Sequence, residues 1–314
     1  MRRRRVRPAS FVALLALAAI LGAGCSSTKK AGVSIEERLA KAEKETAPDK
    51  KATAFVRAAR AQAAKNDWDG AKKSGAKALA ALEGEGDAGL FVPRLVDVAA
   101  LLAELGERKP AREALARAIE LSDGIQDPVR KTELLAEAGA VYGDKAKGTA
   151  DSQGAKDTLK KAAEVAYGVE ERFRAQALAA VAIGYTRSGQ AEAASDVVDK
   201  LLEAAKTLEE PRAKAEALAA AAGVQLRTGK KDEAEKLLAD AQAAAKSVER
   251  AESRAYALFA VAQATEAGGD LKKTLALLKE ADKAADKVPE PGSQKKIVDK
   301  VRAAMADVEK RIKK

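Results

Sequence analysis

The sequence predicts an all-α protein, an α-solenoid of about six antiparallel helix hairpins that ends in a C-terminal capping helix. Aromatic residues make up only 3% of the 314 residues. Apolar residues recur at helical spacing in segments such as "AEALAAAAGVQL" and "ALFAVAQATEA", without the two-residue alternation that is typical of strands. A repeat of about 40 residues runs through the chain, and such a period is typical of a solenoid.

The repeat is clearest in the C-terminal half of the chain. The segments "RAQALAAVAIGYTRSGQAEAA", "KAEALAAAAGVQLRTGKKDEA" and "RAYALFAVAQATEAGGDLKKT" recur at a constant spacing, and their turn glycines are Gly189, Gly229 and Gly269. Gly106 and Asn66 occupy the equivalent place in two earlier units. Between Gly106 and Gly189 there is room for one more unit with a small insertion near "DKAKGTADSQ", so the sequence predicts six units.

Small residues recur where two helices of a unit are expected to meet. A large apolar residue stands eleven places before the turn in each aligned unit, and an alanine stands seven places before it: Ala59, Ala99, Ala182, Ala222 and Ala262. A large residue opposite a small one lets antiparallel helices pack closely without voids. The third unit has the same combination of large and small residues at the expected helix contact: Leu135, Gly139, Tyr142, Ala155, Leu159 and Ala162.

These columns and the turn sequence "NDWDGA" (residues 66–71), with Trp68 at an aromatic position, resemble the tetratricopeptide (TPR) repeat. The resemblance covers roughly residues 48–288 and implies a right-handed superhelix. The period departs from that family, because it is about 40 residues here and about 34 in the family. HEAT-like packing is the alternative architecture, which the period favours and the motif does not.

Both ends of the repeat region carry helix signals. "SIEE" at residues 34–37 is a capping box that opens a short leading helix, and Pro48, Pro110, Pro128 and Pro211 stand at expected first-turn positions. Residues 291–314 carry one apolar stripe on a charged helix. We expect this segment to cap the solenoid; a membrane-binding amphipathic helix is the alternative.

Residues 1–24 have the pattern of an export signal. Five arginines precede an apolar run, "FVALLALAAILGA", that is too short to span a bilayer as a helix. Gly22, Ala23 and Gly24 then precede Cys25, the only cysteine. This resembles the lipobox of bacterial lipoproteins, although Gly22 stands where that family prefers leucine. The resemblance implies that residues 1–24 are a signal peptide, that Cys25 is lipidated, and that residues 25–33 are a flexible tether.

An ordinary cleaved signal peptide is the alternative interpretation of the same segment. Under the lipoprotein interpretation Ser26, directly after the cysteine, resembles the signal for sorting to the outer membrane. We therefore expect the chain to lie in the bacterial cell envelope, lipid-anchored and facing the periplasm. Half of the net charge of +10 belongs to the leader. The remainder is an evenly mixed charged surface, which predicts no nucleic-acid binding.

The sequence predicts no enzyme, no cofactor and no metal. The absence of histidine and the single cysteine argue against zinc sites and Cys/His nucleophilic sites. "GEGDAG" (residues 84–89) fits a dinucleotide motif by letter, but a helix is expected before it instead of a strand. Similarly, "SGAK" (residues 74–77) lies within an expected helix without companion motifs. Asp67 and Asp69 are expected at a turn and helix start, and Glu252–Ser253 at the start of a repeat helix.

The resemblance to TPR proteins implies that the first helix of each unit lines a concave binding groove. The positions carried over from that family are Val56, Arg60, Val96, Gln176, Ile183, Arg187, Glu216, Leu226, Arg227, Tyr256, Phe259 and Gln263. Among these, Arg187, Arg227, Tyr256, Phe259 and Gln263 are the predicted partner-binding residues. Arginine binds carboxylates in a bidentate manner, and aromatic rings hold apolar side chains. The alternative is that these residues line the groove without a specific binding role and that one or two of them pack on the capping helix.

Two functions remain open from the sequence. Residues 34–290 form a predicted repeat domain, which suits a non-catalytic scaffold or adaptor for other envelope proteins. The alternative is a periplasmic lipoprotein that binds a glycan or peptidoglycan fragment. Glycan sites usually present several aromatic platforms, and the chain has one tryptophan and four tyrosines. The adaptor is therefore favoured.

Overall fold

A computed structural model describes residues 33–313 of the chain, and in this range it contains fourteen α-helices, one short 3₁₀ helix and no strand. The helices are α1 (Ile35–Lys44), α2 (Pro48–Ala63), α3 (Trp68–Ala80), α4 (Ala88–Glu104), α5 (Arg108–Leu121), η1 (Ser122–Gly124), α6 (Pro128–Gly143), α7 (Ser152–Tyr167), α8 (Glu171–Arg187), α9 (Ala191–Lys206), α10 (Pro211–Arg227), α11 (Lys231–Ser247), α12 (Ala251–Ala267), α13 (Leu271–Ala285) and α14 (Pro291–Ile312).

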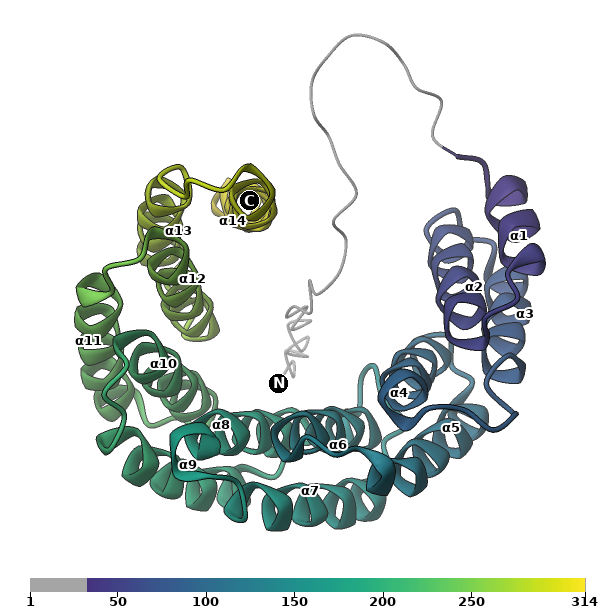
Figure 1. The fold of residues 1–314 in the computed structure, drawn as a ribbon, viewed down its shortest axis with the longest axis horizontal. Helices are drawn as coiled ribbons and strands as arrows, with labels where there is room; N and C mark the ends of the chain where they lie inside the picture. Colours follow the sequence, from purple (N-terminus) through teal and green to yellow (C-terminus); the bar gives the residue numbers. More distant parts are fainter. Residues whose placement is uncertain (1–32, 314) are drawn as a thin grey trace, which may run out of the picture.

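Twelve of these helices pair in sequence as six hairpins, from α2/α3 to α12/α13. The hairpins stack side by side into an open arc, with α1 at one end and α14 at the other (Figure 1). The first helix of each hairpin lies on the inner side of the arc and the second on the outer side (Figure 1). The prediction of an all-α solenoid with six hairpins and a terminal cap is therefore confirmed.

The predicted turn residues have the backbone that the turn needs. Gly106, Gly189, Gly229 and Gly269 have φ between 79° and 87°, and Asn66 has φ of 62°. This left-handed conformation suits glycine and asparagine, since other residues clash there between Cβ and backbone. The third unit differs, because the predicted insertion forms a longer connection between α6 and α7 in which Ala150 takes φ of 55°.

The aligned columns lie in the core. All five alanines of the column before the turn have no exposed surface, and the large residues eleven places before the turn are buried. In the third unit a Cβ added at Gly139 would lie 2.6 Å from Leu159 Cγ, so only glycine fits between α6 and α7 there. The predicted register of the repeat is thus confirmed by burial.

Close contact between inner helices explains the curvature. Each inner helix contacts the inner helix of the next unit, while successive outer helices of the described chain make far fewer contacts with each other. Small residues permit this approach: a Cβ on Gly184 of α8 would lie 2.9 Å from the Ala136 carbonyl oxygen of α6. Because the inner helices are drawn together more than the outer ones, the stack bends with the first helices inside.

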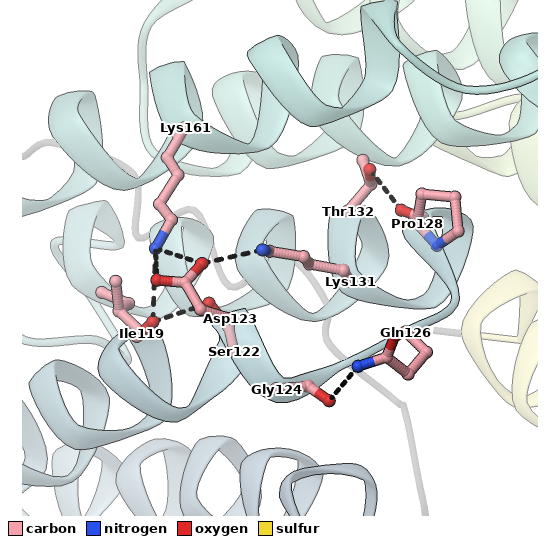
Figure 2. Close-up of polar contacts among 9 residues, drawn as sticks. All are labelled: Ile119, Ser122, Asp123, Gly124, Gln126, Pro128, Lys131, Thr132 and Lys161. Carbon is pink, nitrogen blue, oxygen red and sulfur yellow. Dashed lines mark hydrogen bonds and ion pairs between the residues drawn. The ribbon is translucent and has the colours of Figure 1, made fainter.

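One junction between units carries an ionic cluster. The 3₁₀ helix η1 follows α5, and the Asp123 carboxylate accepts hydrogen bonds from Lys131 Nζ at 2.7 Å and Lys161 Nζ at 3.2 Å (Figure 2). The bond from Lys131, followed by that from Lys161, lowers the pKa of Asp123. The cluster joins η1 to α6 and α7, but exposed pairs of this kind contribute little to stability.

Both predicted end helices are present. Ser34 and Glu37 form the capping box of α1. At the other end, α14 packs on α13 and α12 through Ile297, Val301 and Val308, which are all buried. Arg302 Nε donates to Asp282 Oδ1 at 2.8 Å and Arg302 Nη2 to Asp286 Oδ1 at 3.0 Å, so polar contacts also attach α14 to α13. The apolar stripe of α14 therefore faces the solenoid, as expected of a cap.

The predicted signal peptide, Cys25 and almost all of the tether lie outside the described residues. Across residues 33–313, none of the helices combines the length and the apolar character needed to cross a bilayer.

Candidate functional site

The candidate site is the inner face of the arc, where the first helices of successive hairpins lie next to one another (Figure 1). Arg187 and Arg227 are the last residues of α8 and α10, and Gln263 is an exposed residue of α12. Tyr256 and Phe259 lie nearer the start of α12. With a rise of about 1.5 Å per residue, the arginines stand about 16 Å further along the helix direction than Tyr256.

The two arginines form one positively charged spot. Neither of them makes an ion pair with the described residues, and Arg187 Nε is buried without a hydrogen-bond partner among them. Loss of hydration, and then the charge of Arg187, lower the pKa of Arg227. Two like charges that are close and partly desolvated are costly. The spot is therefore suited to an anionic group from outside the chain.

An acidic side chain lies near Arg187 on the neighbouring inner helix α6, which contacts α8. Glu137 of α6 is open to solvent on one side, but neighbouring helices displace part of its hydration. This loss of hydration, and then the charge of Asp97, raise the pKa of Glu137, while the charge of Arg187 opposes the change. Glu137 thus lies between an acid on α4 and a base on α8.

Two further acids of the inner face are already paired. Asp97 Oδ2 accepts from Arg94 at 2.9 Å, and Glu133 pairs with Arg130 at 3.4 Å. Glu133 also accepts a hydrogen bond of 2.8 Å from Gln176 Nε2 of α8. Sequence reasoning missed these acids, although Asp97 and Glu137 stand one repeat period apart and the same register that found the arginines could have found them.

The predicted aromatic spot needs correction. Phe259 is only 5% exposed and belongs to the core, because α14 covers this part of α12 and places Lys300 Nζ 4.7 Å from the ring centre. Val56 and Val96, two further predicted groove residues, are also buried. Tyr256 is half-buried, with the Arg212 guanidinium 5.1 Å from its ring centre and Lys300 Nζ at 5.8 Å on the α14 side.

A separate groove of about 1100 Å³ lies at the other ends of the inner helices. The starts of α8, α10 and α12 form it, and its lining includes Gln176 and Glu216, which the sequence placed in the groove. Phe173 at its edge is 42% exposed and stacks with Arg172 at 4.5 Å. The groove continues the inner face away from the two arginines.

The sequence motifs that fit enzymes by letter have structural roles. Residues 84–87 lie between α3 and α4 and residues 88–89 begin α4, so a helix precedes the motif, and Arg117 Nη2 donates to the carbonyls of Glu83 and Gly84 at 2.7 Å each. Ser74 is buried and donates to Gln62 Oε1 at 2.7 Å. Asp67 caps α3 by accepting from Gly70 N at 2.9 Å. Within residues 33–313 no group of three acidic, histidine or cysteine side chains is placed to hold a metal ion.

No protein-family model matches the chain, and no curated protein matches it. Several solved structures are similar in shape. A kinesin light chain with nearly identical TPR-like repeats from Podospora anserina is 20% identical, with a TM-score of 0.40, and the match covers 65% of this chain and 98% of that one. BtubC (BKLC) from P. vanneervenii is 16% identical, with a TM-score of 0.41, and 82% and 95% of the two chains are covered.

A Rap protein in complex with competence and sporulation factor is 13% identical, with a TM-score of 0.37, over 88% of this chain and 79% of that one. These likenesses are distant. The class of the protein rests on its own hairpins, turns and small-residue columns, which define a TPR-like α-solenoid.

Proposed function

We propose that this chain is an envelope-anchored lipoprotein that acts as a non-catalytic scaffold, binding a segment of another envelope protein on the inner face of its solenoid. The observation that carries the proposal is the arginine spot: Arg187 and Arg227 come from neighbouring hairpins, lie together, and have no ion-pair partner among the described residues. A fold that holds two repelling cations on a concave surface is suited to an acidic side chain or chain terminus of a partner.

Capture from envelope extracts tests the scaffold function. The wild-type protein is expected to retain specific proteins, and the double variant Arg187→Ala/Arg227→Ala is expected to retain less of them, with a weaker dependence on salt, because charged contacts are screened by ions. The matched control is Arg112→Ala/Lys231→Ala, which removes the same number of positive charges from exposed positions on the outer helices α5 and α11. Equal capture by wild type and the Arg187/Arg227 variant would overturn the role of the spot.

The lipid anchor rests on the leader pattern and on Cys25. Labelling of growing cells with a fatty-acid analogue is expected to mark the wild-type chain, whereas Cys25→Ser is expected to stay unmarked and to accumulate as precursor or as released protein. An unmarked wild-type chain would refute the lipoprotein proposal. The outer membrane, facing the periplasm, is the proposed location because Ser26 follows the cysteine, and separation of the two membranes on a density gradient tests it.

A further inference from the structure

The inner helices of the arc carry unpaired charges of opposite sign. On α4 and α6 the acids without an ion pair among the described residues are Glu104 and Glu137. On α8 and α10 the arginine spot, Arg187 and Arg227, ends the two helices, and Glu216 of α10 is paired with Arg212. These four inner helices contact one another in order, α4 with α6, α6 with α8 and α8 with α10. The change of sign therefore occurs between α6 and α8.

Ion pairs within the described residues leave some negative and some positive side chains of the inner face unpaired. Arg94 neutralises Asp97 and Arg130 neutralises Glu133, but Glu137 has no ion pair among the described residues, and neither have the two arginines. Arg187 is close enough to affect Glu137 without forming an ion pair with it. A free carboxylate and two free guanidinium groups thus stand next to one another on the same concave surface.

We propose that the inner face recognises an extended segment of a partner protein that carries a basic side chain over Glu137 and an acidic side chain over Arg187 and Arg227. This inference rests on the proposed scaffold function and specifies the partner's chemistry. Neighbouring packed helices are about 8–10 Å apart, so a point midway between α8 and α10, over the two arginines, lies about 13 Å from α6. At about 3.3 Å per residue, the partner's two charges stand roughly four residues apart.

Uniformly charged partners fit this surface less well. A polyanion such as a nucleic acid, or a purely acidic peptide, would place negative charge against Glu137 and its acidic neighbours on α4 and α6. A purely basic peptide would meet the arginine spot. Like charges across an interface are unfavourable, and on a partly desolvated concave face they are screened less than on an open surface. The charge pattern therefore selects a segment that carries both signs.

Three synthetic peptides of equal length test the inference on the full chain in mild detergent. The first carries two lysines and two glutamates with about three residues of Ala and Ser between the two pairs, the second carries glutamate at all four places, and the third carries lysine at all four. Binding is measured by fluorescence anisotropy in about 50 mM salt, where charged contacts are weakly screened. The peptide with both signs is expected to bind about tenfold more tightly than either of the others.

Charge reversal at one end locates the contact. Glu137→Arg is expected to weaken the peptide with both signs about tenfold and to strengthen the acidic peptide. The matched control is Glu235→Arg on the outer helix α11, where the glutamate is exposed, and it is expected to change neither. If Glu137→Arg lowers the helix content seen by circular dichroism, Arg187→Glu/Arg227→Glu makes the same test from the other end and is expected to strengthen the basic peptide.

Three results would overturn the inference: equal binding of a uniformly charged peptide, no binding of any of the three, or equal effects of Glu137→Arg and Glu235→Arg. Capture of partners from envelope extracts is a separate measurement, so these results leave the scaffold function itself to its own test. If Arg187→Ala/Arg227→Ala loses that capture but the three peptides bind equally well, a partner binds at the arginine spot and does not carry the predicted pair of opposite charges.

Discussion

At the scale of single residues, the close approach of helices within and between hairpins depends on alanine and glycine. Ala182 of α8 and Ala222 of α10 have no exposed surface, and Gly139 and Gly184 stand where even a methyl group would collide. Protein interiors are packed as densely as organic crystals, so a larger side chain at these sites has no void to enter.

Enlarging these alanines tests the register. Ala182→Leu and Ala222→Leu are each expected to lower the free energy of unfolding by about 1–3 kcal/mol through overpacking. Lys231→Leu introduces the same side chain at an exposed site and is expected to change it by less than about 0.5 kcal/mol. Urea unfolding followed by circular dichroism measures all three. Equal midpoints would mean that the alanine columns do not mark helix contacts.

The second prediction at this scale concerns Glu137. Its pKa is raised in the folded protein by lost hydration and by the Asp97 charge, with Glu133 acting in the same direction and Arg187 and Arg130 against it. A carboxyl with a raised pKa destabilises the folded state as the pH rises above its ordinary unfolded value of about 4.3, because the folded state then loses a proton that it prefers to keep.

Glu137→Gln is therefore expected to raise the thermal midpoint at pH 7, and the difference from wild type is expected to vanish below about pH 4, where the unfolded carboxyl is also protonated. Glu235→Gln on the outer helix is the control and is expected to show little difference at either pH. A constant gain for Glu137→Gln across the whole range would show that packing, and not ionisation, is responsible.

At the scale of helices, α14 replaces the neighbour that the last hairpin would otherwise lack. It is the longest helix of the described chain, covers Phe259 and buries Ile297, Val301 and Val308. Terminal units of a solenoid need such a cover, because an uncapped hairpin exposes the face that normally packs on the next unit. The cover is also the reason why Phe259 is unavailable to a partner.

Two isoleucines of α14 make a matched pair for testing the cap. Ile297 is fully buried and Ile312 is 39% exposed. Ile297→Ala is expected to lower the free energy of unfolding by about 2–5 kcal/mol, the usual range for a cavity in a core, while Ile312→Ala is expected to stay within about 0.5 kcal/mol. Urea unfolding compares them. Similar losses at both positions would show that the buried part of the stripe, at Ile297, contributes no more to stability than its exposed end.

At the scale of the whole molecule, the core is a row of local contacts without a single centre. One group of buried residues runs from Ala42 to Ala155 and another from Leu135 to Val308, and they meet at α6 and α7. In such an arrangement each unit is stabilised mainly by its neighbours, so stability approximates a sum of local terms.

A local change is therefore expected to have a local effect. In Ala222→Leu, amide hydrogen exchange measured by mass spectrometry is expected to accelerate in α8–α13 and much less in α2–α5. Ala59→Leu, in the equivalent column of the first hairpin, is expected to show the reverse distribution. Equal acceleration throughout the chain in both variants would show that the arc unfolds as one cooperative unit.

The sequence by itself determined the helical class, the six hairpins and their turns. These depend on local properties: helical spacing of apolar residues, glycine or asparagine where φ is positive, and alanine where helices meet. Because the units repeat, they can be aligned with one another, and the alignment assigns Ala182 and Ala222 to equivalent helix contacts. The arginines could be placed on the first helices for the same reason.

Only the tertiary structure decided which of these positions is accessible and what lies beside it. Phe259 and Gln263 share one helix, yet the former is covered by α14 and the latter is exposed. The charge change between Glu137 and Arg187 likewise depends on α6 and α8 lying side by side, although α7 separates them in the sequence. Burial and charge proximity arise from contacts between separate helices, and the pattern along one helix does not specify which side chains of another helix lie against it.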